Sequence, residues 1–139
     1  MSKAIERAER ASRGRAAIMV LAAIVFMINA IIDFGEPAYS EPGWRGAAWP
    51  VIVLLWLVIV ATGGGLSANR RLRELMNDEL SVHNRGRAIA AGFYATNFSA
   101  VGVYYASWSI PMNSGDALRL VTGIGVSAAL LVYAWLEWN

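Results

Sequence analysis

The chain has 139 residues, of which 57% are hydrophobic and 16% are charged, and its mean hydropathy is +0.44. This composition excludes a disordered chain and disfavours an ordinary soluble domain. There is no cysteine and a single histidine, His83. A disulfide relay, a zinc finger, an iron–sulfur site and a bis-histidine haem are therefore excluded as sites built from the chain's own residues.

Long stretches without charge recur along the chain. A bilayer core requires about 20 consecutive apolar residues wound as a helix, which predicts spans at about 16–33, 47–66, 88–110 and 117–136. A soluble four-helix bundle is the competing prediction, but the run from Val51 to Val60 lacks the polar face that such a bundle requires. Pro50 is expected in the first turn of the second span. The predicted fold class is all-α, an integral membrane four-helix bundle that forms one domain over 16–137.

Lysine and arginine gather on one side of the predicted spans. Of the twelve, five lie in a basic tail at 1–15 and five in the loop at 67–87. Cytoplasmic loops carry an excess of these residues, so we expect a protein of the bacterial inner (cytoplasmic) membrane with both termini in the cytoplasm. The five loop arginines are expected to contact lipid headgroups or a cytoplasmic partner: Arg70, Arg71, Arg73, Arg85 and Arg87.

The loop at 67–87 is the only sizeable polar segment besides the tail. Leu72, Leu75, Met76 and Leu80 recur at a helical period, which predicts a short amphipathic cytoplasmic segment on the membrane surface. His83 lacks a partner at metal-ligand spacing, so no metal site is expected. The basic residues flank spans and are explained by topology, so no nucleic-acid partner is expected either.

The third predicted span has two patterned faces. One face holds small residues, which are expected to pack closely against another helix: Gly92, Ala95, Ser99, Gly102 and Ala106. The other face is aromatic and carries one amide. Its simplest interpretation is packing within the bundle or against lipid, with Asn97 hydrogen-bonded to Asn29 or Tyr94. The alternative is a groove for a lipid, quinone or carotenoid pigment, lined by Tyr94, Asn97, Tyr104 and Trp108.

Ionisable residues lie only at the ends of the predicted spans. A charge inside a bilayer is costly and usually functional, so their absence argues against a proton-coupled pump. Asp33 and Arg119 are expected to form an ion pair between the first and fourth spans. The sequence indicates no catalytic residues and no cofactor held by side-chain ligands, although a bound lipid, quinone or carotenoid needs only apolar walls.

One segment is similar to a known group of proteins. The stretch Leu75–Ala88, leading into Gly92-Phe93, resembles a loop of small uncharacterised four-span inner-membrane proteins of alphaproteobacteria, of the sphingomonad type. The resemblance extends through Pro111–Leu131, about half of the chain, and implies the topology but no activity.

Other four-span families lack their required residues here. Quinone-linked disulfide generators need cysteines and diheme cytochromes need several histidines. Small multidrug exporters need a glutamate where this chain has Ile24, Val25 and Phe26. Fluoride channels need a dual topology, which the charge bias opposes.

The leading functional hypothesis is a non-enzymatic accessory, scaffold or assembly subunit of a membrane complex, or a homo-oligomer. Its partners would be membrane lipids and other membrane subunits or a second copy. One alternative is a channel or carrier for a small solute or ion, whose path passes Asn29, Asn97 and Tyr94. Another is a lipid-, quinone- or pigment-binding protein. An enzyme acting on lipid headgroups would use Glu74, Asp78, Glu79 and His83.

Overall fold

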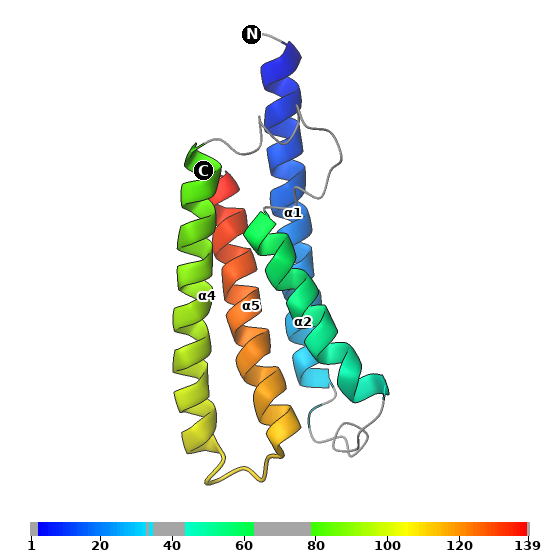
Figure 1. The fold of residues 1–139 in the computed structure, drawn as a ribbon, viewed down its shortest axis with the longest axis vertical. Helices are drawn as coiled ribbons and strands as arrows, with labels where there is room; N and C mark the ends of the chain where they lie inside the picture. Colours follow the sequence, from blue (N-terminus) through cyan, green and yellow to red (C-terminus); the bar gives the residue numbers. More distant parts are fainter. Residues whose placement is uncertain (1–2, 33, 35–43, 63–78, 139) are drawn as a thin grey trace.

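The computed structural model describes residues 3–32, 34, 44–62 and 79–138, and the prediction of an all-helical chain is confirmed for this part. It contains four α-helices. They are α1 (Lys3–Ile32), α2 (Trp44–Thr62), α4 (Glu79–Ala106) and α5 (Ser114–Trp138) (Figure 1).

The observed bounds differ from the predicted spans mainly at the helix starts. Helix α1 begins at Lys3, so most of the basic tail is helical. Helix α4 begins at Glu79, and the end of the predicted 67–87 loop therefore forms its first turns. Residues 63–78 lie outside the described residues, and with them Arg70, Arg71, Arg73 and most of the predicted amphipathic segment.

The expected position of Pro50 was wrong. Helix α2 begins at Trp44, which places Pro50 inside the helix, in its second turn. Proline has no backbone N–H and forfeits one i→i−4 hydrogen bond when it lies beyond the first turn. The helix therefore starts before the proline instead of at it.

Helix α5 is the central element of the fold. It runs antiparallel to α1 and α4, which flank it, while α2 crosses in front of α1 at an angle (Figure 1). The two chain ends lie at the same end of the molecule. Helix α5 also contributes many of the buried residues, among them Leu130 and Tyr133, which are fully buried.

Glycines let α4 approach α5 closely. A Cβ on Gly92 would lie 2.9 Å from the Cβ of Ala129 and 3.0 Å from the carbonyl oxygen of Gly125. A Cβ on Gly125 would clash with the side chain of Thr96. Small residues at such contacts bring two helix backbones together and increase their van der Waals packing.

Helix α1 meets α5 through a row of alanines. Ala16, Ala23 and Ala30 are buried and are seven residues apart, the spacing that keeps one face of a helix against its neighbour. A Cβ on Gly123 would lie 2.8 Å from the Cβ of Ala30. The Ser127 hydroxyl donates to the carbonyl oxygen of Ala23 at 3.2 Å, which satisfies the only polar atom of this buried side chain.

Two of the described helices are long and apolar enough to cross a bilayer by length and composition. They are Arg13–Ile32 within α1 and Ser114–Trp138, which is all of α5. The apolar part of α2, Ala48–Thr62, is shorter. Helix α4 is long but is not among these candidates, because Asn, Ser, Thr and Tyr residues are interspersed along it. The structure thus supports two of the four predicted spans by this measure.

We expect Gly92→Ala to lower the free energy of unfolding by about 1–3 kcal/mol, the usual cost of overpacking a well-packed contact. The added methyl would lie too close to Ala129 and to the α5 backbone. Thermal unfolding followed by circular dichroism in mild detergent measures the effect. Gly102→Ala on the same helix is the control, because a Cβ there meets nothing within 4 Å. Equal melting temperatures for the two variants would contradict the close α4–α5 contact.

Candidate functional site

A cluster of aromatic and polar side chains joins α1, α2 and α5. The rings of Phe26 and Trp49 are stacked, with centroids 4.6 Å apart. The Trp49 indole Nε1–H donates to the Thr122 hydroxyl at 3.1 Å. The Arg119 guanidinium lies 5.1 Å from the centroid of the Trp49 ring and donates to the carbonyl oxygen of Asn29 at 3.3 Å. Trp49 is thus held by stacking, a hydrogen bond and a cation–π contact at once.

Arg119 was predicted to pair with Asp33. Asp33 lies outside the described residues, so the pair stays a prediction. Arg119 itself is only 6% exposed, and its guanidinium reaches α1 through the Asn29 carbonyl. Asp116, one turn earlier on α5, is buried as well. Its backbone N–H is capped by the Asn113 side chain at 2.8 Å, which stabilises the start of α5.

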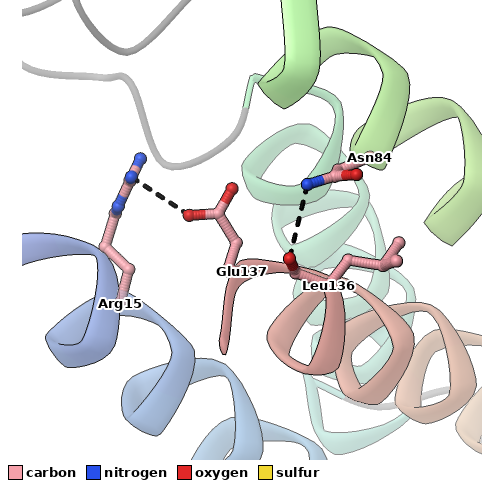
Figure 2. Close-up of polar contacts among 4 residues, drawn as sticks. All are labelled: Arg15, Asn84, Leu136 and Glu137. Atoms are coloured by element: carbon pink, nitrogen blue, oxygen red, sulfur yellow. Dashed lines mark hydrogen bonds and ion pairs between the residues drawn. The ribbon is translucent and has the colours of Figure 1, made fainter. Parts of the chain in front are cut away.

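A second polar cluster lies at the opposite end of α5 (Figure 2). The Arg15 guanidinium and the Glu137 carboxylate form an ion pair at 3.1 Å that joins α1 to α5. The Asn84 amide donates to the carbonyl oxygen of Leu136 at 3.5 Å and joins α4 to α5. Both contacts lie at the C-terminus of α5, where carbonyl groups lack intrahelical partners and cations are favoured.

An apolar cavity of about 430 Å³ lies between α2, α4 and α5. Its buried wall comprises Val60, Gly92, Gly125, Val126 and Ala129. Its sides are the partly exposed residues Leu57, Ile89 and Phe93. A smaller cavity of about 170 Å³ lies between α1 and α2, next to Asn29 and Trp49.

Tyr94, Asn97 and Tyr104 of the predicted groove lie on the outward surface of α4, and Trp108 lies two residues beyond its end. Tyr94, Tyr104 and Trp108 are each about 60–70% exposed, and Asn97 is also exposed. The Asn97 amide donates to the carbonyl oxygen of Phe93 at 2.8 Å. It was expected to bond Asn29 or Tyr94 instead. The four residues line neither of the two cavities above, and with other exposed side chains they form what we call the aromatic face of α4: Tyr94, Asn97, Phe98, Val101, Tyr104, Tyr105 and Trp108.

The predicted small-residue face is only partly turned toward α5. Gly92 is buried, Ala95, Ser99 and Ala106 are half-buried, and Gly102 is exposed and faces open space. Asn84 and Ala88, which the prediction did not include, are buried. The buried residues follow a four-residue spacing from the start of α4, a row along which crossing helices pack. That spacing was readable in the sequence, but the prediction placed residues 67–87 in a loop.

The remaining predicted residues lie near the start of α4. Arg85 is half-buried, whereas His83 and Arg87 are exposed. Among the side chains of the described residues, no three His, Cys, Asp or Glu groups are close enough to hold a metal ion.

Comparison of the chain with protein-family models, curated proteins and solved structures found no match. The resemblance to alphaproteobacterial inner-membrane proteins therefore stays a prediction.

We expect Trp49→Phe to lower the free energy of unfolding by about 1–3 kcal/mol. Phenylalanine keeps a ring against Phe26 but loses the bond to Thr122 and weakens the cation–π contact with Arg119. The matched control is Trp108→Phe, since Trp108 is 69% exposed. Chemical or thermal unfolding in mild detergent compares them, and a larger loss for Trp108→Phe would refute the structural role of Trp49.

Proposed function

We propose that the chain is an integral protein of the bacterial inner membrane, a four-span helical bundle with both termini in the cytoplasm. We further propose that it is not an enzyme and acts by association, as an accessory, scaffold or assembly subunit of a membrane complex or as a homo-oligomer. The apolar outer surface of α2 supports membrane integration, and the aromatic face of α4 supports association.

Helix α2 supports membrane integration because it buries little of its apolar surface. Of its side chains described, only Trp49 and Val60 are buried. Val53, Trp56 and Ile59 are half-buried against the core, and six further large apolar residues are exposed: Val51, Ile52, Leu54, Leu55, Leu57 and Val58. Water would make such a continuous apolar patch unfavourable, whereas lipid chains would solvate it. Ile18, Leu21 and Ile24 of α1 are similarly exposed.

The aromatic face of α4 is the observation that carries the association hypothesis. It presents tyrosine, tryptophan and an amide, and α4 is not among the helices apolar enough to cross a bilayer alone. Tyrosine and tryptophan are enriched at protein interfaces, where a ring is buried and its polar group can find a partner. Polar side chains also join helices in membranes. This surface therefore suits another protein helix better than it suits lipid.

The carrier alternative gains no support from the geometry. Its path required Asn29, Asn97 and Tyr94 to lie together. Asn29 lies beside the small cavity between α1 and α2, whereas Tyr94 and Asn97 lie on the outward surface of α4. Both amides donate to carbonyl groups of their own helices.

The proposed topology is tested by cysteine labelling, for which a chain without cysteine is well suited. We expect a membrane-impermeant maleimide to label Ser109→Cys, between α4 and α5, from the periplasmic side in spheroplasts. We expect His83→Cys, at the opposite end of α4, to be labelled only after permeabilisation. Both positions are exposed. The reverse pattern would refute the orientation, and recovery of the chain in the soluble fraction would refute integration.

Association is tested by photo-crosslinking in native membranes. We expect benzoylphenylalanine in place of Phe98, which is 77% exposed, to give adducts with a second copy or with another membrane protein. The same group at Leu21 on α1, 62% exposed, is the control and should give lipid adducts only. Equal protein adducts at the two positions, or none at Phe98, would contradict association through the aromatic face.

A further inference from the structure

Helix α2 is fixed to the rest of the bundle near one of its ends. Trp49 contacts Phe26, Thr122 and Arg119 at once, as described above. A hydrogen bond and a cation–π contact depend on distance and direction, so together with the stacked ring they hold Trp49 in one position. Trp49 lies in the second turn of α2, which begins at Trp44.

Beyond this point α2 is held to its neighbours by apolar contacts. The side chains of residues 51–61 are apolar or, in Trp56, aromatic. The hydroxyl of Thr62 donates to the carbonyl oxygen of Val58 in the same helix at 2.7 Å. Lipid chains are as apolar as these side chains, so in a bilayer the contacts of Val60 can be exchanged for lipid at little cost. The second half of α2 is therefore the part of this helix that is free to move.

Space for such a movement lies on two sides of α2. The cavity of about 430 Å³ separates residues 53–61 of α2 from α4 and α5. The cavity of about 170 Å³ separates residues 49–56 from α1. Because α1 and α4 flank α5 (Figure 1), α2 has space toward each of these two helices. Side chains that face a cavity lack packing partners there, so a displacement of α2 breaks few contacts.

Pro50 provides a bending point next to the fixed end. It has no backbone N–H and cannot donate to the carbonyl oxygen of Gly46, four residues earlier. Its own side chain is exposed, so bending there repacks no buried ring. Prolines inside helices are the usual positions of kinks above about 20°. Thr62 lies about 18 Å further along the helix, so a change of about 20° displaces it by about 6 Å.

From the fixed Trp49, the bending point at Pro50 and the space beside the helix, we propose that α2 is a hinged lid over the cavity between α2, α4 and α5. Residues 51–62 swing toward and away from α4 while Trp49 stays in place. The gap between Ala61 and Ile89, two exposed residues that line the cavity, then narrows and widens. The exchange of apolar contacts for lipid rests on the proposed membrane integration, but the lid does not depend on association through the aromatic face of α4.

The lid is tested by distances between spin labels on the full chain in nanodiscs of phosphatidylcholine and phosphatidylglycerol. The chain has no cysteine, so each introduced pair is labelled alone. Double electron–electron resonance compares three pairs of exposed positions, for the swinging end of α2, its fixed end and the α4–α5 contact: Thr62→Cys with Ala90→Cys, Val51→Cys with Phe98→Cys, and Ala90→Cys with Leu131→Cys. We expect the first distance distribution to be wider than the third by about 6 Å, and the second to be as narrow as the third.

Two substitutions test the hinge and the space beneath the lid. Pro50→Ala restores the backbone N–H, so the Thr62–Ala90 distribution should become as narrow as that of the α4–α5 pair. Ala61→Phe places a ring in the cavity from an exposed position and should remove the shorter Thr62–Ala90 distances. Ala100→Phe is the matched control, because Ala100 is exposed on α4 and lines neither cavity. It should leave the distribution unchanged.

A third substitution tests the fixed end. Thr122→Val removes the hydroxyl that accepts from Trp49 while keeping the size of the side chain. We expect it to widen the Val51–Phe98 distribution, because Trp49 then keeps only its ring contacts. Circular dichroism of each variant verifies that it is folded.

The outcomes separate the lid from the proposed function. A Thr62–Ala90 distribution as narrow as that of the α4–α5 pair, or equal widths at the two ends of α2, would overturn the lid and leave membrane integration intact. An unchanged width in Pro50→Ala would overturn the hinge, and equal effects of Ala61→Phe and Ala100→Phe would overturn movement over the cavity. Failure of the chain to enter nanodiscs would overturn integration, and with it the exchange of contacts for lipid.

Discussion

The close approach of α1 and α4 to α5 is the constraint on which the rest of the structure depends. Gly92, Gly123 and Gly125 leave no room for larger side chains at the points where the three helices meet. Helices in this arrangement gain stability from van der Waals contact between backbones, an interaction that does not require water to be expelled. This packing therefore stabilises contacting helices in a bilayer as well as in water. It also concentrates burial on α5, so that the apolar side chains of α2 and the aromatic side chains of α4 are left at the surface.

The polar contacts supplement this packing at the two ends of α5. One end is held by Arg15–Glu137 and Asn84–Leu136, and the other by the arrangement of Arg119, Trp49 and Thr122. The proposed membrane integration requires such a placement, because charges inside a bilayer are costly. Between these ends the described interior is mostly apolar, with the Ser127 hydroxyl bonded to Ala23, and a cavity lies between α2, α4 and α5. Helix α2 therefore contributes both to the exposed apolar surface and to the wall of this cavity.

Individual residues show which features of the fold could be predicted from the sequence. The helical content follows from long uncharged apolar stretches, and the all-helical prediction is confirmed for the described residues. The small-residue pattern indicated that Gly92 packs closely, but not that Gly102 faces open space, because which part of a face is used depends on where two helices cross. The seven-residue row Ala16, Ala23 and Ala30 was visible in the sequence and was not used in the prediction. Asn97 bonds its own helix, an option that is open to any helical amide.

By itself the sequence determined that the chain is helical and unusually apolar, that its positive charge is concentrated in two segments, and that cysteine and bis-histidine chemistry is excluded. These properties depend on composition and local periodicity, which no tertiary contact alters. Only the tertiary structure decided that α5 is central, that Trp49 lies against Phe26, Arg119 and Thr122, and that a cavity lies behind α2. Those features join residues far apart in the sequence, such as Trp49 and Thr122, which are 73 positions apart, and they depend on crossing positions that sequence spacing does not encode.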